Sequence, residues 1–259
     1  MSHFYEKLTD GSVLPRHLVP MSSRPDELRP TRMTDVNKWL KEGRRVVPSV
    51  TTILNVLNKS GLNNWIVDQH LEQAYSIRNR DETNNFWDIE RYVSEVKRLT
   101  ELELDKAPSA GSDFHKMMDD YSLNAADKTD PLFPLFVSVM DAVIKKCDPD
   151  ENKSFMCEKN FVSDLGYGGQ IDLIYEDWVI DYKTKQTAAK FKPGKMAYDD
   201  HRMQLAAYRK AVAPRAHCAN VFVCLEDGQI DFHEHTEEEL GRGWKLFEHA
   251  LAIWKLQNL

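Results

Sequence analysis

Two acidic residues and one lysine have a spacing that suits phosphodiester chemistry. Eight residues separate Asp172 from Asp181, and a single residue separates Asp181 from Lys183. The β-branched and aromatic residues around them predict two strands joined by a tight turn at Glu176-Asp177, which brings Asp172 close to Asp181. Because side chains alternate along a strand, Asp181 and Lys183 share one face.

A divalent cation is the partner that these carboxylates favour. Charged groups flanked by apolar residues are costly to bury alone, and Mg²⁺ takes oxygen ligands from one or two carboxylates, water and phosphate. Lys183 can then position or help deprotonate an attacking water and offset negative charge in the transition state. On spacing alone, an exposed hairpin with a weak Asp181–Lys183 salt bridge is an equally open alternative.

The elements that position these residues are predicted from periodicity and turn signals. The C-terminal half contains strands at 155–162, 170–175 and 178–183, a helix at 198–212, and strands at 220–225 and 229–233 around an Asp227-Gly228 turn. Thr236 and Glu239 form a capping box for a last helix. Its buried stripe is Leu240, Trp244, Phe247, Leu251 and Trp254.

The N-terminal half is predicted to be mainly helical. Residues 1–48 are rich in Pro and Arg and are expected to form an irregular arm. Helices follow at 48–61, capped by Ser49 or Thr51, and at 63–79, 85–104, 109–123 and 131–146. We therefore expect one α/β domain over 1–259, with an arm at 1–48, a mainly helical part at 49–148, and a mixed central sheet flanked by helices at 149–259.

Composition and charge agree with a globular domain that meets a polyanion through a local patch. The 259 residues are 42% hydrophobic and 29% charged, which excludes a disordered chain, and the net charge is -7. Residues 182–215 nevertheless contain nine Lys or Arg against two acids, a local net of +7. The cations that directly follow the proposed site suit a nucleic-acid backbone. They are Lys183, Lys185, Lys190, Lys192, Lys195 and Arg202.

Several separated motifs, in order, resemble the RecB-type branch of the PD-(D/E)XK nuclease superfamily over residues 48–235. They are Gly111-x-x-x-His115, Gly169-x-x-Asp172, Asp181-x-Lys183 and Gln204-x-x-x-Tyr208. The segments 48–51 (PSVT), 179–184 and 204–208 look most similar to the branch that contains phage exonucleases and the mitochondrial genome maintenance exonuclease.

The resemblance implies a restriction-endonuclease-like core and a role for each matching residue. Asp172 and Asp181 would be metal ligands and Lys183 catalytic, while His115 would be a ligand or a phosphate contact and Glu158 an acidic residue near the metal. Gln204 and Tyr208 would contact DNA, together with Lys185, Lys190, Lys192 and Arg202. From the residues alone, a helical histidine such as His115 is more often an ordinary core or surface residue. Gln204 and Tyr208 alone favour a half-buried amphipathic helix around Leu205.

The expected function is a DNA exonuclease dependent on Mg²⁺ or Mn²⁺, acting on single strands or ends in replication, recombination or repair. His115 suggests that Mn²⁺ supports activity well, because imidazole is a softer ligand than Mg²⁺ usually takes. A structure-specific endonuclease on the same fold, a non-catalytic DNA-binding module and an RNA substrate stay open. The sequence does not indicate a protein partner, an oligomeric state or a polarity.

Other cofactors are not expected. Cys147, Cys157, Cys218 and Cys224 lack the close C-terminal trio that holds an iron–sulfur cluster in some relatives, and a Walker A sequence for ATP is missing. His233 and His235 share a strand face, but alternating polar residues on an outer strand are normally exposed, so we expect no second metal site there.

A membrane location is not expected either. The most apolar stretch, 131–144, is interrupted by Pro134, Ser138 and Asp141. The first residues lack the apolar core of a secretory signal and do not read as a transit peptide. We therefore expect a cytoplasmic protein of a bacterium or of a phage-infected cell.

Overall fold

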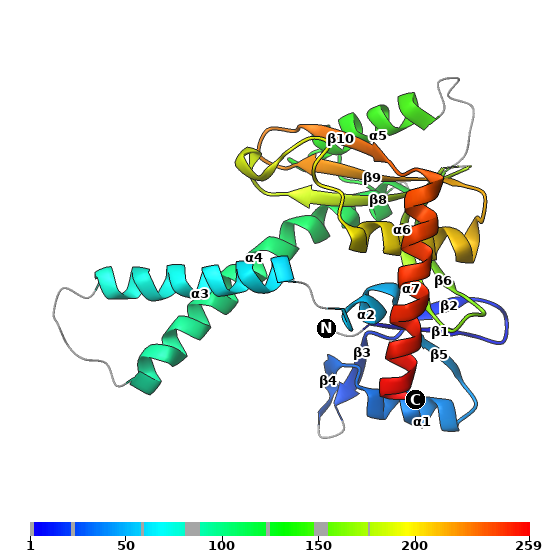
Figure 1. The fold of residues 1–259 in the computed structure, drawn as a ribbon, viewed down its shortest axis with the longest axis horizontal. Coiled ribbons are helices and arrows are strands. Elements are labelled where there is room, and N and C mark those ends of the chain that lie inside the picture. The colour runs from blue at the N-terminus through cyan, green and yellow to red at the C-terminus, as the bar shows by residue number, and fades with distance from the viewer. Residues whose placement is uncertain are drawn as a thin grey trace. The chain divides into compact units, whose positions relative to one another are not determined.

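A computed structural model describes residues 3–21, 24–57, 60–80, 89–122, 125–147, 155–175 and 177–259. They form two compact units, Met1–Leu57 with Phe114–Leu259, and Asn58–Asp113. The first unit holds the central sheet (Figure 1). Within the described ranges, no helix has the length and apolar character needed to cross a membrane.

The central sheet has five strands and confirms the mixed α/β class. Its strands are β6 (Phe155–Val162), β7 (Gly168–Tyr175), β8 (Trp178–Lys185), β9 (His217–Cys224) and β10 (Ile230–Glu234). Their order is β10-β9-β8-β7-β6, and only the β8–β9 pair is parallel. The parallel pair needs a crossover, which the short helix η1 (Ala188–Lys190) and α6 (Asp199–Val212) supply. The predicted strands are thus present, with ends shifted by a few residues.

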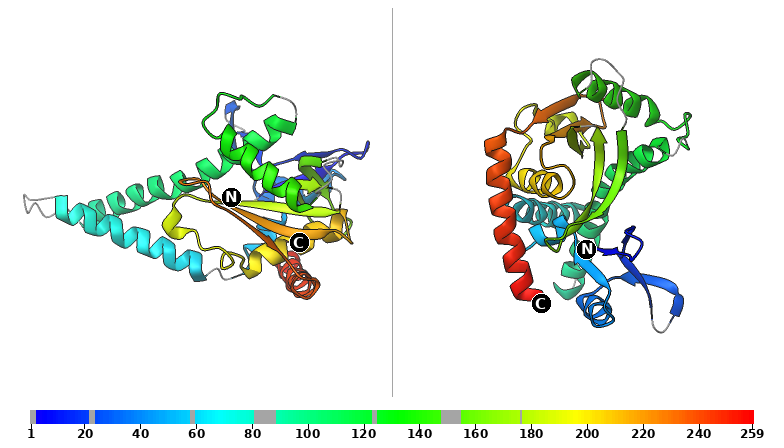
Figure 2. Two further views of the ribbon diagram at one scale, coloured as in Figure 1. Left: turned by 90° about the horizontal axis from the view of Figure 1, so that it is seen from above. Right: turned by 90° about the vertical axis from the view of Figure 1, so that its right-hand side faces the viewer.

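Helices cover both faces of this sheet, as the right-hand view of Figure 2 shows. On one face, Leu173, Ile180 and Tyr182 pack against α5 (Phe133–Cys147) and against Phe114 at the end of α4. On the other face, β7 and β8 pack against α6 and α7 (Glu237–Asn258). The odd and even residues of β8 therefore serve different cores, as strand alternation predicts.

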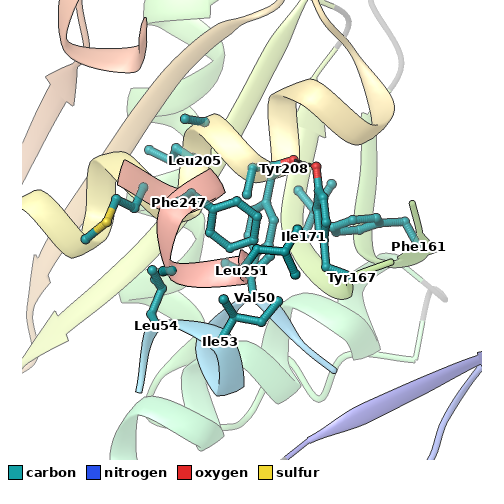
Figure 3. Close-up of a cluster of buried hydrophobic side chains, with 14 of the residues drawn as sticks. Val50, Ile53, Leu54, Phe161, Tyr167, Ile171, Leu205, Tyr208, Phe247 and Leu251 are labelled. Atoms are coloured by element: carbon teal, nitrogen blue, oxygen red, sulfur yellow. Dashed lines mark hydrogen bonds between the residues drawn. The ribbon is translucent and has the colours of Figure 1, made fainter. Parts of the chain in front are cut away.

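The α6–α7 core fixes the position of α6 over the sheet (Figure 3). Phe247 and Leu251 of α7 meet Leu205 and Tyr208 of α6, and Val50, Ile53 and Leu54 of α2 (Val50–Leu54) close the cluster. The Thr236–Glu239 capping box and the buried stripe of α7 are confirmed, although Trp244 is only partly buried. The Ser49 cap of α2 is also confirmed, since its hydroxyl accepts the Thr52 N–H at 3.0 Å.

The expectation of an irregular arm over residues 1–48 is wrong. The segment forms β1 (Phe4–Lys7), β2 (Val13–Pro15), β3 (Leu18–Met21), β4 (Arg24–Pro30), α1 (Met33–Lys41) and β5 (Arg45–Pro48). The sheet order β2-β1-β5 buries Phe4, Tyr5, Val46 and Val47. These strands are short and have prolines at their ends, so they show too little alternation to be predicted from the sequence. Proline is tolerated at strand ends and sheet edges.

The middle of the chain is helical, as expected, with two differences. The helix expected at 48–61 is wrong in its end, because α2 stops at Leu54 and a separate helix begins at Ser60. Helix α3 spans Ser60–Arg80, but the two helices expected at 85–104 and 109–123 are one helix, α4 (Ile89–Ser122). The backbone continues through Pro108, because proline removes one hydrogen bond and kinks a helix without always ending it. The boundary between the two compact units falls inside α4, after Asp113.

Candidate active site

The site lies where β7 and β8 separate. Their antiparallel pairing runs from Tyr175–Trp178 to Leu173–Ile180 and ends there. At the next position the carboxylate of Asp172 accepts the backbone N–H of Tyr182 at 2.7 Å from Oδ2. The Asp172 side chain thus replaces the backbone carbonyl that would accept the next β7–β8 hydrogen bond. Asp172 and Asp181 are both buried, at 8% and 1% exposure. Glu176, part of the predicted turn, lies outside the described residues.

Glu158 on β6 stands opposite Asp172. The β6–β7 register pairs Cys157 with Leu173 and Lys159 with Ile171, which leaves Glu158 facing Asp172. Glu158 has φ 49°, the only positive φ among the non-glycine residues that the structure describes. Such a conformation is strained for a side chain of this size, by on the order of 1 kcal/mol or more. The strand is therefore distorted where the second carboxylate joins the site.

His115 completes a cluster of one imidazole and two carboxylates. Its Nδ1 lies 3.2 Å from Glu158 Oε1 and 3.6 Å from Asp172 Oδ1. One ligand atom from each of the three residues lies within 4.8 Å of the others. Phe114, Met117 and Met118 anchor the end of α4 in the core, which holds His115 over the sheet.

Lys183 and Asp181 form a second group on β8, beside this cluster. Lys183 Nζ lies 2.5 Å from Asp181 Oδ2 and donates to Gln204 Oε1 at 3.3 Å. Gln204 Nε2 donates in turn to the Tyr208 hydroxyl at 2.8 Å. The spacing of four on α6 therefore aligns Gln204 and Tyr208 toward the lysine. The structure brings together residues of all four motifs.

The pKa values of several site residues are shifted because carboxylates lie close together. Burial and the neighbouring Asp181 raise the pKa of Asp172 to about 7, although His115 and Lys183 pull it down. Burial lowers the pKa of His115, but Asp172 and Glu158 outweigh burial and raise it to about 9. Burial also opposes the charge of Lys183, yet Asp181 and Asp172 raise its pKa above the ordinary value. The site is a place where positive charge is strongly favoured.

The predicted DNA-contacting residues are in different environments. Gln204 and Tyr208 are buried, at 9% and 4% exposure, and bond to each other and to Lys183. Arg202 pairs with Asp199 at 2.8 Å and with Glu239 at 3.2 Å, so its charge is already engaged. Lys190 and Lys192 are exposed after β8, whereas Lys185 is half-buried, and burial and Lys183 lower its pKa.

Sequence reasoning missed Asn220. This residue on β9 is fully buried, and its Nδ2 donates to Asp181 Oδ2 at 2.8 Å. Its Oδ1 faces His235 Nε2 at 2.8 Å. A single amide in the otherwise apolar run 218–224 of β9 was the available signal. The parallel register, which sets Asn220 beside Asp181, was not visible in the sequence.

The donor set fits a divalent cation. The buried Asp172, whose pKa Asp181 and Glu158 help to raise, needs a compensating charge. His115, Glu158 and Asp172 together offer one nitrogen and two oxygens. Such a mixture suits Mn²⁺ and is compatible with Mg²⁺ when water and phosphate complete the shell. Asp181 lies next to this cluster, with its Oδ2 shared between Lys183 and Asn220.

Comparisons with known proteins give structural likeness only. Neither a protein-family model nor a curated protein sequence matches the chain. Among solved structures, it is similar to a candidate exonuclease from Eubacterium rectale, with 13% identity, a TM-score of 0.38, and coverage of 56% of this chain and 67% of that one. It is also similar to an alkaline exonuclease from Laribacter hongkongensis, with 13% identity, a TM-score of 0.28, and coverage of 57% and 85%.

Proposed function

We propose that this chain is a metal-dependent nuclease of the PD-(D/E)XK superfamily that hydrolyses DNA phosphodiester bonds. One observation carries the proposal. It is the proximity of the His115–Glu158–Asp172 cluster to the Asp181–Lys183 pair at the point where β7 and β8 separate. All of these residues except Glu158 belong to the motifs, and the five come from three strands and a helix.

His115, Glu158 and Asp172 would hold the cation, with Asp181 as the adjoining carboxylate. A bound divalent cation would supply charge neutralisation at the phosphate and lower the pKa of a coordinated water. The hydrogen bond from Tyr182 N–H holds the Asp172 carboxylate in one orientation. Asn220 does the same for Asp181. Both carboxylates are therefore positioned before a substrate arrives.

Lys183 would stabilise the charge that develops on the phosphate. Its ammonium has three N–H groups, and Asp181 and Gln204 engage two of them. The third is available to a non-bridging phosphate oxygen or to the attacking water. Gln204 and Tyr208 would act as positioning residues for Lys183, since both are buried and bonded in series behind it.

DNA is the substrate that the charge distribution favours in this proposal. Exposed Lys190 and Lys192 follow the catalytic strand directly, and residues 182–215 have a local net charge of +7. A basic segment beside a metal site can track a phosphate backbone. We propose exonucleolytic action on single strands or DNA ends, in replication, recombination or repair.

A cleavage assay tests this function. The protein is incubated with end-labelled linear single-stranded DNA or with covalently closed single-stranded DNA, in Mg²⁺, Mn²⁺ or EDTA. We expect ladders from linear DNA alone, and no products in EDTA. Cutting of closed circles would replace the exonuclease with an endonuclease on the same site. Binding without cleavage under every metal condition would overturn the nuclease proposal in favour of a DNA-binding module.

A further inference from the structure

A second group of metal-ligating side chains lies where β10 passes into α7. His233 is on β10, His235 follows the strand, and Glu239 is the third residue of α7. One ligand atom from each of the three lies within 4.8 Å of the others. The two imidazole rings meet edge to face, with centroids 4.7 Å apart. The expectation that this pair is simply exposed is wrong, because His235 is only 4% exposed.

Hydrogen bonds fix the tautomer of His235. The Asp181 carboxylate accepts from Asn220 Nδ2, so the amide must present its Oδ1 to His235. That oxygen is an acceptor, and His235 Nε2 must therefore carry the proton and donate to it. A neutral imidazole has only one N–H. The other ring nitrogen, Nδ1, then carries a lone pair.

This lone pair has no partner in the part of the chain that the structure describes. His235 Nδ1 and His233 Nε2 are both buried, and neither has a hydrogen-bond partner there. Burying a polar atom without a partner is unfavourable, and natural proteins rarely leave such atoms unexplained. The Nδ1 atom points toward Glu239, with Oε2 at 3.9 Å. That separation is too long for a hydrogen bond, but an ion bound to both atoms would span it.

The charges around the group favour a small cation with nitrogen affinity. Glu239 Oε2 accepts the Thr236 N–H at 2.9 Å, and Oε1 pairs with Arg202 Nε at 3.2 Å. Arg202 repels a cation here, but it also pairs with Asp199, which shares its charge. With two imidazoles and one carboxylate, the set resembles a zinc site with an open position and is poorly suited to Mg²⁺.

We propose that His233, His235 and Glu239 form a second metal site that takes Zn²⁺ or a similar transition-metal ion. It is separate from the His115 cluster and is linked to it by a short relay from His235 through Asn220 to Asp181. Its function is structural. The ion fixes the end of β10 to the first turn of α7 and locks the Asn220 amide that orients Asp181.

Equilibrium dialysis tests the proposal. The purified full chain is stripped of metal with EDTA, and its binding of Zn²⁺ is measured in excess Mg²⁺. The reference is His115→Asn, which weakens the first cluster. We expect this variant to bind one Zn²⁺ per chain. Adding His233→Asn or Glu239→Gln should weaken that binding by about tenfold or more, since loss of even an outer-shell partner has an effect of this size. Adding His249→Asn, an exposed histidine of α7, should leave it unchanged.

Failure of the second-site proposal is distinguishable from failure of the proposed nuclease function, because zinc binding is measured without a nucleic-acid substrate. A His115→Asn protein that binds no Zn²⁺, or one whose binding survives His233→Asn, would overturn the second site. A thermal shift gives an independent readout. Zn²⁺ should raise the Tm of the His115→Asn protein and of its His249→Asn derivative, but not that of its His233→Asn derivative. An equal shift in all three would also overturn the proposal.

Discussion

The carboxylate of Asp172 accepts the backbone N–H of Tyr182 at 2.7 Å, one position beyond the last β7–β8 backbone pair. The interaction keeps the Tyr182 amide satisfied in the interior while the two strands separate. It also commits one Asp172 oxygen to the backbone and leaves the other, Oδ1, facing His115 at 3.6 Å. A hydrogen bond that stabilises the fold thus orients a proposed metal ligand.

Asp172→Asn should stabilise the protein in EDTA at pH 8. The folded-state pKa of Asp172 is raised from 3.8 to about 7, so the wild type loses stability as the pH rises from about 4 to 7. Asparagine cannot ionise, and it keeps an oxygen for the Tyr182 N–H. We expect urea unfolding to show a gain on the order of 1 kcal/mol.

Mg²⁺ should reverse the order of stability of the wild type and Asp172→Asn. It should raise the Tm of the wild type more than that of Asp172→Asn, because the variant lacks a charged ligand. An Asp172→Asn protein that is less stable than the wild type in EDTA would contradict the account of a crowded, negatively charged site.

Gly168→Ala should destabilise the protein by about 1–3 kcal/mol through overpacking. A Cβ at Gly168 would lie 2.7 Å from the Phe161 carbonyl oxygen and 3.1 Å from Tyr5 Cβ. Gly241→Ala is the matched control, since a Cβ there meets nothing within 4 Å. In an exposed helix interior, that change should stabilise by about 0.5–1 kcal/mol. Thermal unfolding of both variants checks the contrast, and equal shifts would count against the close packing of β6 and β7.

His201→Gln should flatten the decline of stability in acid. Burial and the nearby Lys183 lower the folded-state pKa of His201 from 6.5 to about 4. The unfolded chain therefore takes up a proton first, and stability falls as the pH drops from 6.5 to 4. Glutamine retains an acceptor for the Tyr198 N–H, which His201 Nδ1 accepts at 3.2 Å.

Urea unfolding at a series of pH values between 4 and 8 measures this effect. The wild type should lose on the order of 2 kcal/mol more than His201→Gln between pH 7 and pH 4. Parallel curves for the two proteins would show that His201 does not titrate in this way. The exposed His249→Gln should follow the wild-type curve.

Asn220→Leu should destabilise by about 1–3 kcal/mol, because it leaves two buried partners without their hydrogen bonds. One is Asp181 Oδ2 and the other is His235 Nε2. The loss should be smaller when His235→Leu is already present, since one of those partners is then gone. A double-mutant cycle by urea unfolding measures the difference, and strict additivity would show that the amide and the imidazole are not coupled.

Local patterns were sufficient to predict most of the elements around the site. Strand alternation placed Asp181 and Lys183 on one face of β8, and a spacing of four placed Gln204 and Tyr208 together on α6. The capping box and apolar stripe of α7 were equally local. Each of these features depends on residues a few positions apart, where periodicity determines geometry.

Long-range pairing accounts for what the sequence did not reveal. Asn220 meets Asp181 only through the parallel β8–β9 register, and a register between strands so far apart in the chain leaves no short pattern. The N-terminal strands were hidden for a related reason, since Phe4 and Val47 are buried by pairing between β1 and β5. The continuous α4 shows that a proline does not always end a helix.

The most direct test of the nuclease account is single-turnover cleavage of end-labelled single-stranded DNA in Mg²⁺ or Mn²⁺ by wild type and Lys183→Met. Methionine has a similar length but lacks the ammonium that Asp181 and Gln204 hold. The account predicts metal-dependent cleavage by the wild type, a rate about 10²-fold or more lower in the variant, and similar DNA binding by both proteins. Equal cleavage rates, or cleavage that persists in EDTA, would contradict it.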